Sequence, residues 1–507
     1  MTNTRTIARN SGWFGLETVI GVVVGLFTTI LIARYLGPQK NGYLITVSYL
    51  VTVVSNLGGM GIPATTRKYM AEFIGMGDRG TARFIYYRTL LLQVGLASLS
   101  TAGLLFWVLR DAPVDYRLAS SLIALSMWPA MVNFVSSQAN AATEDLSANL
   151  PASVLSTFVY FIAVAITVVM KWGVIGVGAS LLCMRAVDFL VRFFPTLKRI
   201  RSWETTNVIP PDLRKRMLSF AWQSVASMVV ALIVWDRCEV LLLYKLCPDI
   251  RQVSFYSAAF TMAKQLLLGA TIFGTAVGTT IFAQYGRDRS RLPDITASSF
   301  RYLAMTSIPL HSISTALAVP MLLLLFTNQY ADASMVVMIA PLLCLPAAFV
   351  GPVQSLLQSV ERQSYIIAAT VFAGFVDIGV AWYLIPAHGA VGACIGSGVA
   401  QLTAVGLMWA AGIYLYKVRL PWLLLAKIIF ASALAALTAH YISARLPLLW
   451  GILLGGSASL VVLLVLFYLM HVLEPEDRAR FGTLTRMLPE AMATSANFVL
   501  DLVFPQE

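Results

Sequence analysis

Residues 448–470 read LLWGILLGGSASLVVLLVLFYLM, a stretch of 23 residues without a charged side chain. An α-helix rises about 1.5 Å per residue, so a stretch of this length crosses the roughly 30 Å hydrocarbon core of a bilayer. No water is present in that core to hydrogen-bond the backbone, whereas a helix satisfies its own N–H and C=O groups. This stretch therefore predicts a transmembrane helix.

The composition indicates that most of the chain has the same character. Hydrophobic residues make up 58% of the 507 residues and charged residues 12%, with a mean hydropathy of +0.77. A soluble domain carries about 25% charged residues, so much of this apolar surface must face lipid. We predict an all-α polytopic membrane protein with about fourteen spans. The predicted spans are Gly12–Leu36, Gly42–Ala64, Arg83–Leu109, Arg117–Asn140, Leu150–Met170, Gly173–Leu197, Met217–Leu246, Val253–Gln284, Ser298–Phe326, Ser334–Gln358, Ser364–Ile385, Gly389–Tyr416, Trp422–Ile442 and Leu448–Val472.

The basic residues between spans predict the orientation of the chain. One set of connections holds Arg67, Lys68, Arg79, Arg83, Lys198, Arg199, Arg201, Arg214, Lys215, Arg216, Arg287, Arg289, Arg291, Lys417 and Arg419. The opposite set holds only Lys40, Arg110, Arg117, Lys171, Arg251 and Arg445. Because cytoplasmic loops are enriched in Lys and Arg, both termini are expected in the cytoplasm. The net charge of +12 is spread over these loops, so we expect contact with membrane lipids and not with nucleic acid.

An internal repeat predicts two lobes. LIARYLGP at 31–38 is echoed by LLLYKLCP at 241–248, and WGVIGVGA at 172–179 by HGAVGACI at 388–395. Two-lobed repeats are typical of transporters. The predicted organisation is an N-terminal lobe of six spans at 1–197, a cytoplasmic linker at 198–216, a C-terminal lobe of six spans at 217–416, two extra spans within 417–473 and an amphipathic cytoplasmic tail at 474–507.

Four cations inside predicted spans are candidate substrate-binding residues, because charges deep in lipid are costly unless they face a cavity or a partner. They are Arg185, Lys264, Arg237 and Arg88. Together they predict a cationic cavity that binds phosphate oxygens, which suit the planar fork of arginine. For Arg185 the alternative is a structural ion pair, and for Arg88 it is a side chain that extends to the membrane interface.

Five acids in the spans are candidate charge partners or coupling-ion sites: Asp188, Asp236, Glu239, Glu17 and Asp377. Asp188 lies one helical turn from both Arg185 and Arg192, so it can neutralise either of them. For the other four acids, the residues leave two roles open, holding a cation in place or taking up H⁺ or Na⁺.

The sequence contains no HExxH, GxxxxGK[ST], DxD or GxSxG motif and no long polar loop that could form a catalytic domain. The five cysteines are scattered, with no metal-ligand spacing. We therefore expect no catalytic residues, no bound metal and no cofactor, and the protein is not expected to be an enzyme.

Several segments resemble polysaccharide biosynthesis flippases of the Wzx type. These are RNSGWFGLE at 9–17, ILIARYLGPQKNGY at 30–43, GIPATTRKYMAE at 61–72, WDRCEVLLLYKL at 235–246 with VSFYSAAF at 253–260, and HGAVGACIG at 388–396. The family belongs to the multidrug/oligosaccharidyl-lipid/polysaccharide exporter superfamily. The resemblance implies two six-helix lobes, alternating access and a bacterial inner-membrane location. It also implies an undecaprenyl-pyrophosphate-linked oligosaccharide as substrate, with a polysaccharide polymerase and a chain-length regulator as partners.

The resemblance carries over only a general role, that of cavity cations, onto Arg185, Lys264, Arg237 and Arg88. Span one lacks the arginine cluster expected for a lipid II flippase, which argues against a peptidoglycan precursor as substrate. Two alternatives stay open. A drug/cation antiporter of the same superfamily would need an acidic cavity, and a membrane polymerase or ligase acting on lipid-linked sugars would need a long external loop.

Overall fold

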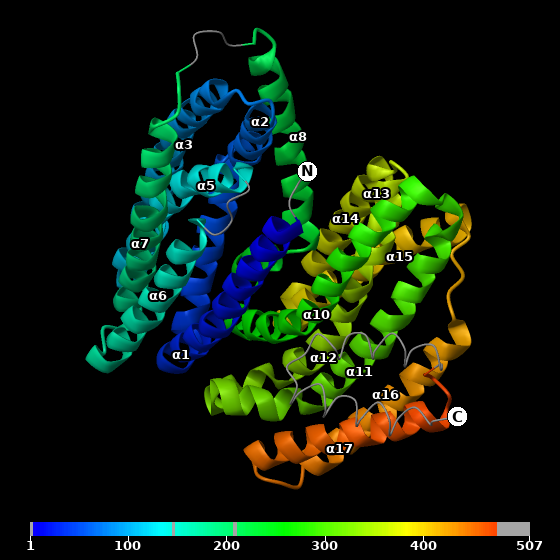
Figure 1. The fold of residues 1–507 in the computed structure, drawn as a ribbon. Coiled ribbons are helices and arrows are strands. Elements are labelled where there is room, and N and C mark those ends of the chain that lie inside the picture. The colour runs from blue at the N-terminus through cyan, green and yellow to red at the C-terminus, as the bar shows by residue number, and fades with distance from the viewer. Residues whose placement is uncertain (1–3, 144–147, 206–209, 474–507) are drawn as a thin grey trace. The chain divides into compact units, whose positions relative to one another are not determined.

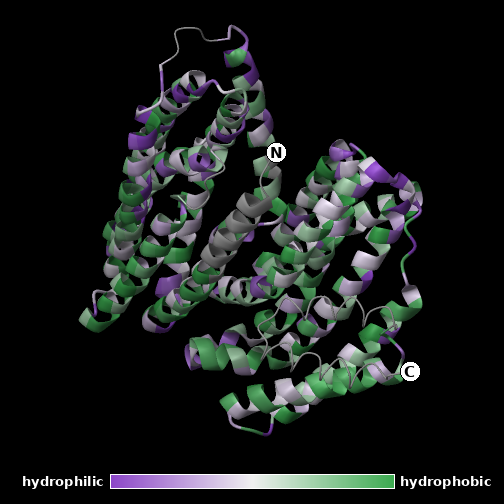
Figure 2. Ribbon diagram, viewed as in Figure 1, coloured by the Kyte–Doolittle hydropathy of each residue, from purple (hydrophilic) through white to green (hydrophobic). Residues whose placement is uncertain are grey.

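The computed structural model describes the backbone of residues 4–143, 148–205 and 210–473. The predicted tail at 474–507 lies outside the described residues. Throughout the described residues the regular structure is helical, and thirteen helical segments are long and apolar enough to cross a membrane. In Figure 2 hydrophobic residues run along the helices, while hydrophilic residues gather at helix ends and connections. The prediction of an all-α multi-pass membrane protein is confirmed.

The chain divides into two compact units, Met1–Ser254 and Phe255–Glu507. The helices of the first unit are labelled in Figure 1 and are α1 (Thr4–Gly58), α2 (Ile62–Gly75), α3 (Arg79–Asp111), α4 (Val114–Leu125), α5 (Met127–Ala142), α6 (Leu150–Met170), α7 (Gly173–Arg201), α8 (Leu213–Val234) and α9 (Glu239–Leu246). Its core is packed from side chains such as Ile85, Tyr86, Met127 and Met131, all fully buried.

The second unit contains α10 (Arg251–Arg287), whose first turn belongs to the first unit, and the elements that follow it. They are η2 (Arg289–Arg291), α11 (Leu292–Phe326), η3 (Asn328–Ala333), α12 (Ser334–Cys344), η4 (Leu345–Phe349), α13 (Val350–Ser359), α14 (Gln363–His388), α15 (Ala390–Tyr416), α16 (Trp422–Ser443) and α17 (Leu448–Leu469). The predicted boundaries of the lobes and the linker stay a prediction.

α1 covers two predicted spans at once. Gly37 breaks it with φ of 70° and ψ of 172°, and Pro38 follows directly. Its membrane-compatible part, Ile20–Gly58, has 39 residues and is about twice the length that one crossing needs. Counting its two halves separately, the described helices agree with the prediction of about fourteen spans.

Several predicted boundaries are wrong in detail. The span predicted at 42–64 ends at Gly58, and α2 then begins at Ile62, so Arg67 and Lys68 lie on a helix and not in a loop. The spans predicted at 117–140 and 334–358 are interrupted at Ser126 and by η4. Hydropathy does not reveal such breaks, because each half of a broken span is as apolar as a continuous one.

The glycines of the internal repeat occupy matching backbone positions. Gly173 has φ of 61° and Gly389 φ of 53°, a left-handed region that glycine enters without a Cβ penalty. A Cβ at Gly176 would collide with Thr167 of α6, and one at Gly392 would lie 2.6 Å from the Leu384 carbonyl carbon of α14. In both units the same two glycines therefore allow a tight turn and then a close helix pair.

Candidate functional site

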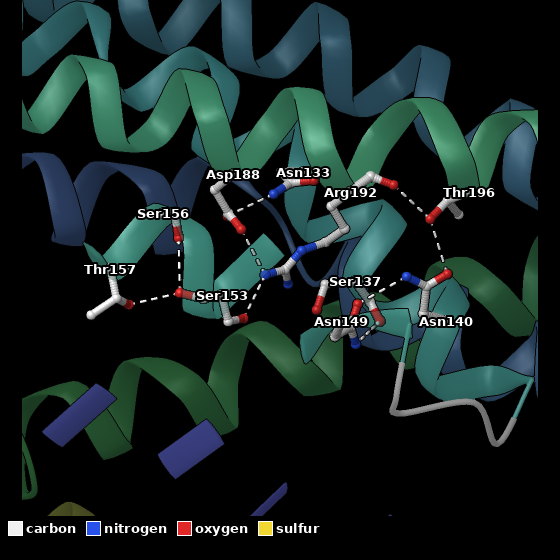
Figure 3. A network of polar contacts seen from close by, with 10 residues as sticks. All are labelled: Asn133, Ser137, Asn140, Asn149, Ser153, Ser156, Thr157, Asp188, Arg192 and Thr196. Atoms are coloured by element: carbon white, nitrogen blue, oxygen red, sulfur yellow. Dashed lines mark hydrogen bonds and ion pairs between the residues drawn. The ribbon is translucent and has the colours of Figure 1, made fainter. Parts of the chain in front are cut away.

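α7 carries a largely buried ion pair that contacts α5 and α6. The Arg192 guanidinium lies 2.7 Å from the Asp188 carboxylate, and the two side chains are 11% and 16% exposed. Asn133 of α5 donates to the other Asp188 oxygen at 2.7 Å, and Arg192 donates to the Ser153 hydroxyl of α6 at 2.8 Å (Figure 3). Asp188 and Arg192 thus tie three helices together.

A second polar cluster lies one to two turns further along the same helices. The Asn140 amide donates to Asn149 at 2.9 Å, and its oxygen accepts from Thr196 at 3.0 Å and from Arg199 at 2.6 Å. Figure 3 shows the contacts of Asn140 with Asn149 and Thr196, which continue the row that begins at Asp188. Asn140 is 1% exposed. Buried amides are costly unless hydrogen-bonded, so this row of contacts stabilises the packing of α5, α6 and α7.

Only Asp188 and Arg192 of this network were predicted from the sequence. The signal that could have found it is the set of asparagines within apolar segments, Asn133, Asn140 and Asn149. The i, i+4 spacing of Asp188 and Arg192 was visible in the sequence. The partners on α5 and α6 depend on how those helices pack against α7, which spacing alone does not reveal.

Arg185 lies on the same face of α7 and is half-buried. About 18 Å of helix separates it from the start of α7 at Gly173, which places it near the middle of a bilayer of ordinary thickness. Asp188, Tyr160 and Arg192 are its electrostatic neighbours, yet no hydrogen bond or ion pair engages its guanidinium within the part of the chain described. Because Arg192 binds the Asp188 carboxylate, the N–H donors of the Arg185 guanidinium make no hydrogen bond to Asp188.

Arg88 and Lys264 are both exposed on their own units, over aromatic rings. The Arg88 guanidinium lies 5.9 Å from the Phe84 ring centroid on α3, and the Lys264 ammonium 5.5 Å from the Phe260 ring centroid on α10. Lys264 lies thirteen residues, about 20 Å of helix, after the start of α10 at Arg251. At this depth the Lys264 ammonium cannot easily extend to the membrane interface, which agrees with the prediction that it binds a ligand.

The predicted continuous span Met217–Leu246 is a broken helix, and this prediction is corrected. α8 ends at Val234 and α9 begins at Glu239, so Asp236 and Arg237 lie in the interruption. Transporter binding sites are often formed at a break within a span, because the helix ends and the backbone carbonyls of the break can bind a substrate or an ion. Within the break, the Cys238 thiol donates a hydrogen bond to the Ile233 carbonyl at 3.2 Å.

The remaining acids are distributed over both units. Glu239 is the first residue of α9 and is fully buried, where the positive end of the helix dipole favours a carboxylate. Asp377 is fully buried in α14 of the second unit. Glu17 lies on α1, and its side chain is outside the described residues. The convergence of cations from both halves on one cavity, and the coupling role of the acids, stay predictions.

The second unit contains a large apolar cavity. It measures about 700 Å³ and lies among α11, α12 and α16, with Val319, Leu342, Ala433 and Leu437 in its lining. A cavity of this size and polarity can hold a long hydrocarbon segment. This cavity was not predicted from the sequence, because it arises from the packing of three helices against one another.

No family model and no curated protein matches the chain. Several solved structures match it. A lipid II flippase MurJ in an inward closed conformation aligns with a TM-score of 0.73 at 14% identity, covering 90% of this chain and 98% of that one. An inward-facing multidrug resistance MATE family transporter of the MOP superfamily aligns with a TM-score of 0.66 at 16% identity, covering 78% and 94%. An outward-facing MATE structure has a TM-score of 0.56 at 15% identity.

The chain has the fold of the multidrug/oligosaccharidyl-lipid/polysaccharide (MOP) exporter superfamily. The fold expected from the sequence resemblance is therefore confirmed. Identities of 14% to 16% carry the fold and not the substrate, so the Wzx-type assignment and the choice of substrate belong to the proposal below.

Proposed function

We propose that this protein is a flippase that moves an undecaprenyl-pyrophosphate-linked oligosaccharide across the bacterial inner membrane by alternating access. The environment of the Arg185 guanidinium is the observation that carries the proposal. It is a half-buried guanidinium near mid-membrane that has no hydrogen bond or ion pair within the described residues, beside an acid already neutralised by Arg192. A free guanidinium at that depth is best explained by an anionic ligand with oxygens spaced for its fork, such as a diphosphate.

Two further observations support a lipid-linked substrate. The fold is shared with a lipid II flippase over 90% of the chain. The cavity of about 700 Å³ among α11, α12 and α16 has the apolar lining that a long hydrocarbon chain requires. The coupling of transport to H⁺ or Na⁺ through Glu239, Asp236, Asp377 or Glu17 is part of the proposal, as are a polysaccharide polymerase and a chain-length regulator as partners.

Replacement of Arg185 tests the proposal in cells. In a strain that depends on this protein for surface polysaccharide, Arg185→Ala should abolish most of the polymer, while Arg185→Lys should retain part of it because the charge stays but the fork is lost. Arg110→Ala is the matched control, since Arg110 lies at the end of α3 with a side chain 74% exposed. Full surface polysaccharide with Arg185→Ala, at equal amounts of inserted protein, would remove Arg185 from the site.

A drug/cation antiporter is the second candidate, because Glu239 and Asp377 are fully buried acids and the MATE fold is also similar. Drug-resistance assays on cells expressing the protein distinguish it: cation export predicts increased resistance that Asp377→Asn removes. A membrane polymerase or ligase is less well supported. The connections on the predicted outer side are short, as between α3 and α4, where only Ala112 and Pro113 intervene.

A further inference from the structure

A polar pocket opens on the second unit, where Thr271 and Thr275 are exposed. It measures about 300 Å³ and lies between α10 and the broken tenth span formed by α12, η4 and α13. Its lining includes Thr271, Thr275, Ala348, Gln354, Ser355 and Gln358. Gln354 lies five residues, about 7.5 Å of helix, before the end of α13 at Ser359.

Glycines set the geometry of the pocket. A Cβ at Gly351 would lie 2.8 Å from the Gly274 Cα, and a Cβ at Gly278 would lie 2.8 Å from the Ser355 hydroxyl oxygen. α10 and α13 therefore touch through their backbones at Gly274 and Gly351, as small residues allow in membrane proteins. The polar side chains flank this contact and are held at a fixed separation on two helices.

The backbone of the tenth span also contributes a polar group to the pocket, the Ala348 carbonyl. Pro352 has no N–H, so the Ala348 carbonyl cannot accept the usual α-helical hydrogen bond from residue 352. Ala348 belongs to the 3₁₀ segment η4 and lines the pocket. Irregular backbone within a membrane span is tolerated where it lines a polar cavity.

The side chains in the pocket have spare hydrogen-bonding capacity. Thr271 and Thr275 donate their hydroxyl protons to carbonyls of their own helix at 2.9 Å, which leaves their oxygen lone pairs available. Within the described chain, the side chains of Gln354, Ser355 and Gln358 make no hydrogen bond, although all three are half-buried. The first unit differs, because Asn133, Asn140 and Asn149 there are engaged with neighbouring side chains.

The chemistry of the lining selects the kind of ligand. Its side chains include no charged group, which argues against a phosphate and against a dehydrated metal ion. At about 30 Å³ per water molecule, the volume corresponds to roughly ten waters, far more than one ion fills. Two primary amides and three hydroxyls provide paired donors and acceptors, which match a neutral molecule rich in hydroxyl groups.

We propose that this pocket binds a neutral sugar ring of the transported substrate. The inference rests on the proposed function, which supplies the oligosaccharide, and it assigns the recognition of sugar to Gln354, Gln358 and Thr271 and that of diphosphate to Arg185. The two sets of side chains suit different parts of the substrate. A guanidinium binds the charged diphosphate, whereas amides and hydroxyls form hydrogen bonds with the hydroxyl groups of a sugar.

Binding of free sugars to the purified full-length protein in nanodiscs tests the inference. Saturation-transfer difference NMR is recorded with a panel of neutral sugars at millimolar concentration: glucose, galactose, mannose, rhamnose and N-acetylglucosamine. At least one sugar should bind, and Gln354→Leu or Thr271→Val should weaken it about tenfold, the effect of losing one or two hydrogen bonds. Gln363→Leu, at the exposed first residue of α14, is the matched control and should bind as the wild type does.

The outcomes separate this inference from the proposed function. Sugar binding that persists in Arg185→Ala but is lost in Thr271→Val, in protein of unchanged melting temperature, supports the pocket whatever happens to polysaccharide export. Binding of no sugar in the panel to the wild type overturns the inference, even if export still depends on Arg185. Equal binding by wild type, Gln354→Leu and Thr271→Val also overturns it, as does ²³Na NMR evidence that the same variants abolish a sodium site.

Discussion

The carboxylate of Asp188 accepts a hydrogen bond from Arg192 at 2.7 Å, so the acid on the polar face of α7 is already neutralised one turn away from Arg185. Asp188 and Arg192 hold α5, α6 and α7 together through their contacts with Asn133 and Ser153. The proposal assigns ligand binding to Arg185, which does not share in this ion pair.

Loss of one member of the Asp188–Arg192 pair should destabilise the protein. Asp188→Leu leaves the Arg192 guanidinium without its counter-charge in a site where its side chain is only 11% exposed, a change that costs about 3 kcal/mol or more. The double variant Asp188→Leu with Arg192→Leu should be more stable than either single variant, because no buried charge remains unpaired. Thermal unfolding of the purified proteins in detergent measures this, and three equal melting temperatures would show that the pair has no structural role.

The repeat glycines should tolerate alanine unequally. Gly389→Ala introduces a Cβ at φ of 53° and ψ of −126°, which costs about 1–3 kcal/mol, and Gly392→Ala forces its Cβ against the Leu384 backbone, at a cost of about the same size. Gly379→Ala, at a helical position with open space around it, is the control and should be neutral or slightly stabilising. Gly389→Ala and Gly392→Ala should therefore both melt below Gly379→Ala, and equal melting temperatures for all three variants would contradict this packing.

The cap of α3 should make a pH-dependent contribution to stability. Hydrogen bonding by Thr81, whose backbone N–H lies 2.8 Å from the Asp78 carboxylate, lowers the pKa of Asp78 below its ordinary value. A lowered folded-state pKa means that the cap stabilises the fold fully above the unfolded value of about 3.9 and loses this contribution as pH falls through the folded value. The melting temperature of Asp78→Ala should lie below that of the wild type at pH 7, and the gap should narrow toward pH 3. A gap independent of pH would show that the carboxylate charge is not what caps the helix.

The sequence predicted the parts of this fold that depend on local composition. The apolar stretches predicted the spans. The paired glycines at 173 and 389 were part of the predicted repeat, because a turn with positive φ needs glycine at that position. The breaks at Ser126, at residues 235–238 and at η4 were missed, since they depend on neighbouring helices.

The candidate site was predictable to the same degree. Arg185 and the Asp188–Arg192 spacing were evident from charge in an apolar helix, whereas Asn133 and Ser153 as partners, and the pairing of α10 with α13 around Gln354, required the packed structure.

Direct binding of a lipid diphosphate to Arg185 is the central claim. Native mass spectrometry of the full-length protein with undecaprenyl diphosphate, titrated against wild type, Arg185→Lys, Arg185→Ala and the Arg110→Ala control, measures it without any need for transport. We expect Arg185→Ala to weaken binding about tenfold or more, as loss of a charge-assisted hydrogen bond of about 1.5–3 kcal/mol implies, Arg185→Lys to be intermediate, and Arg110→Ala to match the wild type. Equal affinity of wild type and Arg185→Ala for the diphosphate would contradict the account.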